Sequence, residues 1–111
     1  MSTFSVFFDP VFERKLAKKD TRFKQWVFRM VEQLKVEPFL GQPLGVRWFR
    51  EKKFEKYRLY YLIFSDLEAI YFVHISEKKD QEVVIATIRQ FGDDYRRELL
   101  QLIENKKKDI I

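Results

Sequence analysis

The most constraining feature of this sequence lies between Val46 and Asp80, where three segments typical of β-strands follow one another with short connections. The strands are predicted at about residues 46–52, 54–64 and 69–75. Because aromatic and branched residues occupy both faces of the last two segments, these strands suit a sheet that is covered on two sides. Neighbouring strands joined by short turns run antiparallel, so the stretch predicts an antiparallel sheet.

The N-terminal third is predicted to add one strand and two helices. Residues 3–8 alternate between apolar and polar or smaller side chains, as a half-buried strand does. An aspartate–proline pair then starts a helix over 10–19, and a second helix begins after Asp20 and stops at Pro38. Residues 39–45 contain two glycines and are predicted to form a loop. The second helix has apolar residues at spacings of three and four, namely Phe23, Trp26, Val27, Met30, Val31 and Leu34.

The C-terminal part is predicted to be helical. One helix runs from Asp80 to Phe91 and is stopped by the glycine that follows. Asp93 or Asp94 can cap a last helix, and we expect its lysine-rich tail at 106–108 to fray. The two aspartates are better explained as helix caps than as a metal site.

The order of these elements defines the predicted fold class. A strand, two helices, three strands and further helices make an α+β fold with a small, mostly antiparallel four-stranded sheet. The two N-terminal helices are expected to pack on one face of that sheet. A chain of 111 residues is long enough for one core, so we expect a single domain over 1–111 with a C-terminal helical extension at about 93–108.

Several classes of chemistry are excluded by composition. The chain has no cysteine, which removes disulfides, thiolate catalysis and cysteine-based metal sites. His74 is the single histidine, so no zinc site can be built from several histidines, and no glycine-rich phosphate loop is present. We therefore expect neither metal nor cofactor. No apolar run approaches the ~20 residues of a membrane helix, and no signal peptide is recognisable, so we expect a cytoplasmic protein that does not enter the membrane.

The remaining chemical resource is positive charge, with a formal net charge of +5. If the three strands pair in order, Lys52, Arg58 and Lys79 converge at one end of the sheet. Cations that meet from distant parts of the chain suit a partner that carries phosphates. The alternative is that these lysines are only the solvated rim of the sheet.

Residues 54–81 resemble the RelE/ParE toxin superfamily. The resemblance rests on Tyr57-Arg58-Leu59-Tyr60-Tyr61, on the hydrophobic strand at 70–75 and on Lys78-Lys79 after it. Gly41-Gln42-Pro43-Leu44 also agrees with the family, as does the order of the upstream elements. Together these features cover about residues 4–88.

The resemblance implies the toxin of a type II toxin–antitoxin pair. RelE-type members cleave mRNA on the ribosome without metal, using the 2′-hydroxyl as the nucleophile. Such a toxin binds a cognate antitoxin through an acidic amphipathic segment, in some cases as a heterotetramer. Fixed cations stabilise the negative charge that develops on the phosphate during this reaction.

The resemblance also assigns roles to single residues. Arg58 matches the family arginine and is expected to stabilise the phosphate, with Lys79 as a second phosphate contact. Lys52 is the candidate base, because neighbouring cations can lower the pKa of a lysine. Glu51 competes for this role if the register differs by one residue, since such a slip exchanges the faces of a strand. Further RNA contacts are expected from Arg50, Lys53, Lys56, Lys78, Trp48 and Tyr60.

The sequence departs from the family pattern where RelE has a functional tyrosine. The corresponding position lies near Ile85, which cannot transfer a proton, so the general acid is left open. Tyr95 could serve only if its helix folds back over the site, and His74 is better explained as a packed side chain than as a late catalytic histidine. Two alternatives therefore stand beside the nuclease: a ParE-like inhibitor of DNA gyrase, and an inactive binding module of the same shape.

Overall fold

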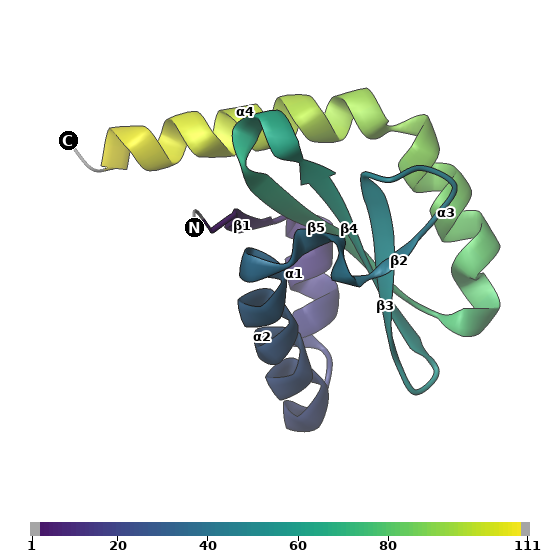
Figure 1. The fold of residues 1–111 in the computed structure, drawn as a ribbon. Helices are drawn as coiled ribbons and strands as arrows, with labels where there is room; N and C mark the ends of the chain where they lie inside the picture. Colours follow the sequence, from purple (N-terminus) through teal and green to yellow (C-terminus); the bar gives the residue numbers. More distant parts are fainter. Residues whose placement is uncertain (1–2, 110–111) are drawn as a thin grey trace.

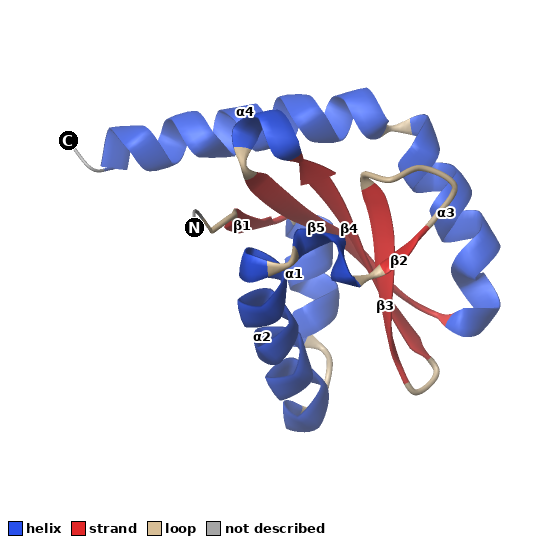
Figure 2. Ribbon diagram, viewed as in Figure 1, coloured by secondary structure: helices blue, strands red, loops and turns tan. Residues whose placement is uncertain are grey.

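A mixed sheet of five strands separates two layers of helices (Figures 1 and 2). This is a computed structural model, and it describes residues 3–109. The strands are β1 (Ser5–Phe8), β2 (Gln42–Pro43), β3 (Phe49–Phe54), β4 (Tyr57–Phe64) and β5 (Ala69–Glu77). The α-helices are α1 (Pro10–Ala17), α2 (Thr21–Val36), α3 (Gln81–Gln90) and α4 (Gly92–Asp109). Short 3₁₀ helices are η1 (Pro38–Leu40), η2 (Ser65–Leu67) and η3 (Lys78–Asp80).

The strand order is β1-β5-β4-β3-β2, which confirms the α+β class and corrects the predicted sheet. The sheet has five strands instead of four, because β2 forms within the expected loop and pairs with β3. The three strands after it are antiparallel as predicted, whereas β1 runs parallel to β5 and places Ser5 opposite Ala69.

The first two helices begin where their capping residues predict. The Asp9 carboxylate accepts a hydrogen bond of 2.8 Å from the backbone amide of Val11, and Pro10 occupies the first turn of α1. The Asp20 carboxylate accepts one of 2.9 Å from the amide of Phe23 at the start of α2. Each cap satisfies an amide that has no partner inside its helix.

The turn between β3 and β4 lies later in the sequence than predicted, because β3 continues to Phe54. Phe54 pairs with Tyr57, so Glu55 and Lys56 alone form the turn. Glu55 adopts a left-handed backbone conformation with φ of 54°, which glycine would adopt at lower cost. The turn fixes the register of β3 against β4, and this register decides which basic side chains share a face.

Two hydrophobic cores form, one on each face of the sheet, as the two-sided apolar pattern predicts. Successive residues of β4 alternate between them: Leu59, Tyr61 and Ile63 face α1 and α2, while Tyr60 and Leu62 face α3 and α4. The first core also contains Phe12, Phe23, Trp26, Val27, Met30, Val31, Leu34, Ile70, Phe72 and Ile75. The second core also contains Phe49, Ala69, Tyr71, Val73, Val84, Ile88 and Leu99.

The C-terminal extension is part of this fold. Helix α4 follows α3 almost directly and crosses the top of the sheet in Figure 1, where its Leu99 is fully buried. Helix α4 extends to Asp109 and thus includes residues 106–108, for which fraying was expected. No helix within residues 3–109 combines the length and the apolar character that a membrane crossing requires.

Candidate functional site

Arg58 lies at the start of β4, on the face of the sheet that α3 and α4 cover. Its cross-strand neighbours are Lys53 on β3 and Ser76 on β5. The side chain is only 6% exposed. Its Nη1 donates hydrogen bonds of 3.1 Å to the carbonyl of Glu55 and 3.0 Å to that of Tyr57. These bonds aim the guanidinium at the β3–β4 turn.

The charge of Arg58 is not neutralised by a carboxylate. Within residues 3–109 no acidic side chain forms an ion pair with it, and its Nε is buried without a hydrogen-bond partner. A buried cation that lacks a counter-ion is costly, because desolvation is not repaid by a nearby opposite charge. An anion that reached this group would gain a strong, charge-assisted contact.

Polar side chains next to Arg58 form a buried cluster between the sheet and α3. The hydroxyl of Tyr60 and Oγ of Ser76 are 2.9 Å apart, and burial raises the pKa of this tyrosine. Glu51, which is 3% exposed, accepts a hydrogen bond of 2.5 Å from Nε2 of Gln81 at the first turn of α3. The start of α3 is therefore bonded directly to the strand beside Arg58.

The register of β3 against β4 places Lys53 beside Arg58, where Lys52 was expected. Lys53 stands opposite Arg58, whereas Lys52 stands opposite Leu59 and thus belongs to the face covered by α1 and α2. Side chains alternate between the faces of a strand, so one residue of offset is sufficient for this change. The structure accordingly brings Lys53 and Glu51 onto the face of Arg58 and leaves Lys52 on the other.

Three further predicted residues gather where β5 ends. Glu77 forms ion pairs with Lys56 at 3.0 Å and with Lys79 at 3.3 Å. Hydrogen bonds from these two ammonium groups lower the pKa of Glu77, and the same pairing raises the pKa of Lys56. Lys78 joins them around a shallow hollow, and its amide bonds to the carbonyl of Lys56. We call the sheet end that carries Lys53, Arg58 and these three lysines the basic end.

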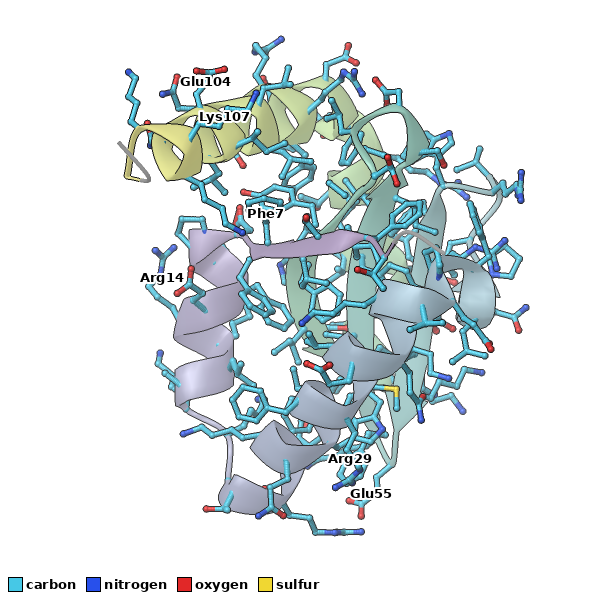
Figure 3. The ribbon with its side chains drawn as sticks, turned by 60° about the vertical axis from the view of Figure 1, so that its left-hand side comes forward. Phe7, Arg14, Arg29, Glu55, Glu104 and Lys107 are labelled. Carbon is cyan, nitrogen blue, oxygen red and sulfur yellow. The ribbon has the colours of Figure 1, made fainter. Side chains whose placement is uncertain are left out.

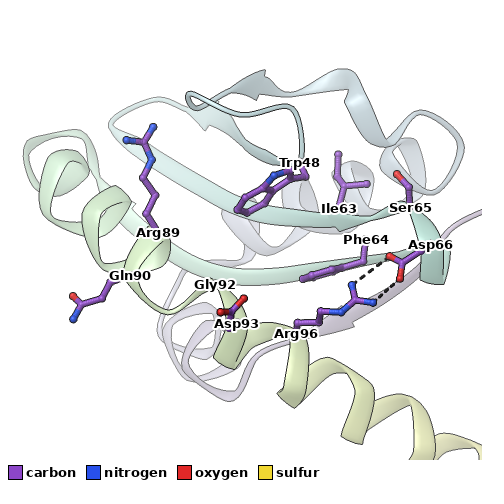
Figure 4. Close-up of a pocket in the computed structure, with 10 residues that line it drawn as sticks. All are labelled: Trp48, Ile63, Phe64, Ser65, Asp66, Arg89, Gln90, Gly92, Asp93 and Arg96. Atoms are coloured by element: carbon purple, nitrogen blue, oxygen red, sulfur yellow. Dashed lines mark hydrogen bonds and ion pairs between the residues drawn. The ribbon is translucent and has the colours of Figure 1, made fainter.

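Trp48 lies away from the basic end. Its carbonyl accepts a hydrogen bond of 2.8 Å from the amide of Ile63, which is five residues beyond Arg58 on β4. Five residues of strand span roughly 16 Å, so Trp48 cannot stack on a base held at Arg58. It instead lines a separate hollow with Phe64 and Arg96, where Arg96 is ion-paired with Asp66 (Figure 4).

Two other expected RNA contacts have structural roles. Arg50 donates hydrogen bonds to the carbonyls of Arg47, Phe39 and Gly41, at 2.8, 2.9 and 2.6 Å, and thereby holds the loop before β3. Tyr60 is fully buried, so its ring has no open face on which a nucleobase could stack. These packing roles of Arg50 and Tyr60 are tertiary features that residue type alone does not indicate.

None of the candidates for a proton donor reaches Arg58. Ile85 packs against the second core, and Tyr95 packs edge-on against Tyr71 at 6.2 Å, where burial raises its pKa to about 12. His74 is half-buried, with Nδ1 3.0 Å from the carbonyl of Ile75, and burial lowers its pKa. No group of acidic or histidine side chains within residues 3–109 is arranged to hold a metal ion.

Ser76 and Gln81 were not among the predicted site residues. Both are uncharged, so the pattern of basic residues does not include them. Position is the signal that could have found them: Ser76 ends an otherwise apolar strand, and Gln81 follows directly after Lys78, Lys79 and Asp80.

Comparison with solved structures shows that the chain has a RelE-like toxin fold. A double mutant of the Escherichia coli toxin RelE in the free state superimposes with a TM-score of 0.68 and 15% identity, over 81% of this chain and 98% of that one. The intact RelBE toxin–antitoxin complex from E. coli matches with a TM-score of 0.61 and 13% identity, over 67% of this chain and 95% of that one. The RelBE2 complex from Mycobacterium tuberculosis matches with a TM-score of 0.59 and 23% identity, over 68% of this chain and 98% of that one. No protein-family model and no curated protein sequence matches this chain.

Proposed function

We propose that this protein is the toxin of a type II toxin–antitoxin pair and cleaves mRNA on the ribosome without a metal ion. The observation that carries the proposal is the buried guanidinium of Arg58, which lacks a carboxylate partner within residues 3–109 and stands beside Lys53 at the basic end. The RelE-like fold supports the same class of activity.

The proposed reaction breaks one phosphodiester bond. The 2′-oxygen of a ribose attacks the adjacent phosphorus, a bond forms between them, and the bond to the 5′-oxygen of the next nucleotide breaks. Arg58, Lys53 and Lys79 stabilise the charge that builds on the phosphate oxygens. Glu51 accepts the proton of the 2′-hydroxyl, since it shares the face of Arg58 whereas Lys52 does not. Water protonates the leaving 5′-oxygen, because Tyr95 and His74 are engaged elsewhere.

Access to Arg58 is part of the proposal. The side chain is 6% exposed, and Gln81 at the start of α3 binds Glu51 next to it. Substrate therefore reaches the guanidinium only when η3 and the first turn of α3 move away from the sheet. The ribosome-bound message is the ligand that we expect to favour this open form.

Substitution of Arg58 tests the assignment. In cells that express the protein from an inducible promoter, we expect Arg58→Ala to lower mRNA cleavage by about 10²- to 10³-fold, as loss of a fixed transition-state donor does. Arg58→Lys should retain part of the activity. The measurement is mapping of new mRNA 5′ ends together with growth, and circular dichroism verifies that each variant folds. A folded Arg58→Ala variant that cleaves like the parent contradicts the role.

The aliphatic Ile85, at the position of the family tyrosine, favours one rival, a ParE-like inhibitor of DNA gyrase that needs no nuclease site. Induction of DNA damage while messages stay intact would decide for it. Normal growth during strong expression would decide for the inactive binding module. The same expression experiment therefore separates all three functions.

The proposal includes a protein partner. The matched structures include complexes of RelE with the RelB antitoxin, so we expect a cognate antitoxin that covers this chain in the cytoplasm, in a heterotetramer or a smaller assembly. Its toxin-binding segment should be acidic and amphipathic, because the basic end attracts negative charge. Copurification with the product of a neighbouring reading frame tests this expectation.

A further inference from the structure

A second basic hollow opens between the C-terminal end of α1 and the end of β5. It measures about 590 Å³ and is lined by Lys15, Lys18 and Lys19 from α1 and the loop after it, together with Tyr57, Ile75, Ser76, Glu77, Asp80, Val83 and Val84. We propose that this α1 hollow binds backbone phosphates of RNA, as an anion site that continues the surface of Arg58. The choice of RNA rests on the proposed function.

The three lysines reach one hollow because they lie together at the C-terminal end of α1. Lys15 is in the last turn of the helix, and Lys18 and Lys19 follow directly after its end at Ala17. Nζ of Lys15 donates a hydrogen bond of 3.3 Å to the carbonyl of Ile75, so α1 is fixed to β5 at this point. Nζ of Lys19 lies 4.6 Å from the centre of the Tyr57 ring. These contacts hold the ammonium groups at the hollow.

The charge around the α1 hollow is not balanced by ion pairs. Among the residues that the structure describes, none of the three lysines is ion-paired with a carboxylate, and Glu77 is already bound by Lys56 and Lys79. Burial and the neighbouring Lys19 lower the pKa of Lys15, whereas Asp80 acts in the opposite direction. The negative end of the α1 dipole favours lysines there, but it does not explain why they surround one hollow.

The α1 hollow adjoins the hollow at the basic end, and Glu77 lines both. Ser76 lines the hollow and is also the cross-strand neighbour of Arg58. Glu77 lines the hollow and also binds the two lysines on its other side. An RNA strand carries one negative charge per nucleotide, so a strand held at Arg58 can place a neighbouring phosphate among the α1 lysines. This adjacency favours RNA over an acidic protein segment, although Val83 beside the lysines is 71% exposed.

Binding of a fluorescent RNA decamer tests the inference. The decamer carries 2′-O-methyl groups, which prevent cleavage, and fluorescence anisotropy gives its affinity at several salt concentrations. We expect Lys18→Gln with Lys19→Gln to weaken binding about 10-fold near 0.1 M salt. Loss of two phosphate contacts on a single strand should also lower the slope of log K against log salt by about 1.4.

The matched control removes the same charge elsewhere. Lys107→Gln with Lys108→Gln changes exposed lysines of α4, and Figure 3 shows Lys107 at the other end of the molecule from Glu55 in the β3–β4 turn. We expect this pair to leave the salt slope unchanged. Equal effects of the two pairs would overturn the inference, because net charge alone would then explain binding.

Two further ligands, 70S ribosomes and an oligoglutamate peptide, show whether the hollow binds ribosomal RNA or an acidic protein. If the Lys18 and Lys19 changes weaken binding to 70S ribosomes and not to the decamer, the phosphates belong to ribosomal RNA and the inference holds. If they weaken binding only to an oligoglutamate peptide, the hollow is a protein site and the inference is wrong. A parent protein that binds the decamer through these lysines and leaves mRNA intact would refute the nuclease and retain the RNA site.

Discussion

At the scale of single residues, Tyr61 links the sheet to the loop before β3. Its hydroxyl donates a hydrogen bond of 2.9 Å to the carbonyl of Pro38 and accepts one of 2.9 Å from the amide of Gly41. A Cβ atom on Gly41 would lie 2.5 Å from that hydroxyl oxygen and 2.6 Å from the Glu51 carbonyl. Glycine at this position therefore allows the loop to approach the sheet.

The buried Tyr61 hydroxyl should make stability depend on alkaline pH. Burial raises its pKa to about 12, above the ordinary value of 10.0. Below pH 10 the Tyr61 hydroxyl contributes its full stabilisation of the folded state. This stabilisation is lost as pH rises towards 12, because the tyrosine of the unfolded chain ionises at lower pH than that of the folded chain. At pH 7 we expect Tyr61→Phe to lower the free energy of unfolding by about 1–3 kcal/mol, since two backbone groups lose their partner.

The pH effect is measured as a difference between proteins. The gap in unfolding free energy between the parent and Tyr61→Phe should shrink by about 1.4 kcal/mol from pH 9 to pH 11, as determined by urea titration. Lysines titrate equally in both proteins and cancel. A gap that is constant across this range would show that the Tyr61 hydroxyl ionises as freely in the folded protein as in the unfolded one.

The individual residues also show which parts of the candidate site could be predicted from the sequence. Arg58 and the lysines after β5 could be proposed for the site because charge and family resemblance mark them in the sequence. Lys52 was placed on the wrong face because the turn at Glu55 and Lys56 has no glycine to mark it, and one residue of offset reverses a strand. The structural roles of Arg50 and Tyr60 come from packing across the sheet, which no local pattern encodes.

At the scale of elements, α4 is the part whose role is least evident from sequence. The sequence predicted only a helical extension beyond the family-like core, whereas in the structure its Leu99 is 0% exposed and packs in the second core. The helices with clear caps and apolar spacing, α1 and α2, were predicted closely. The two-residue strand β2 was not, because glycine and proline around it predict a loop.

Two adjacent leucines of α4 allow a matched test of this packing. We expect Leu99→Ala to lower the free energy of unfolding by about 2–5 kcal/mol, since it leaves a cavity in the core. Leu100→Ala, at a side chain that is 40% exposed, should cost less than about 1 kcal/mol. Chemical denaturation measures both. Similar losses for the two variants would mean that α4 is not seated on the sheet.

At the scale of the whole molecule, the two cores share one sheet and should unfold together. Neighbouring residues of β4 and β5 pack in opposite cores, so neither layer of helices can detach from the sheet by itself. Trp26 reports on the first core, and Trp48 lies beside the junction of α3 and α4. Each tryptophan can therefore follow one layer.

Single-tryptophan variants test this cooperativity. In both Trp26→Phe and Trp48→Phe, the fluorescence of the remaining tryptophan and the circular dichroism should change at one urea concentration, as a two-state protein requires. The comparison is made within each variant, so a change in its overall stability does not matter. Fluorescence that changes before circular dichroism in Trp26→Phe would mean that the C-terminal layer detaches first.

The pairing of β1 with β5 has a consequence for synthesis. Ser5–Phe8 meets its partner only after residue 72 has been made, and Arg58 meets Ser76 later still. A nascent chain on the ribosome thus carries α1 and α2 without the sheet on which they pack. The basic end assembles only after Lys79 has been translated, so a shorter nascent chain lacks the surface that we assign to RNA.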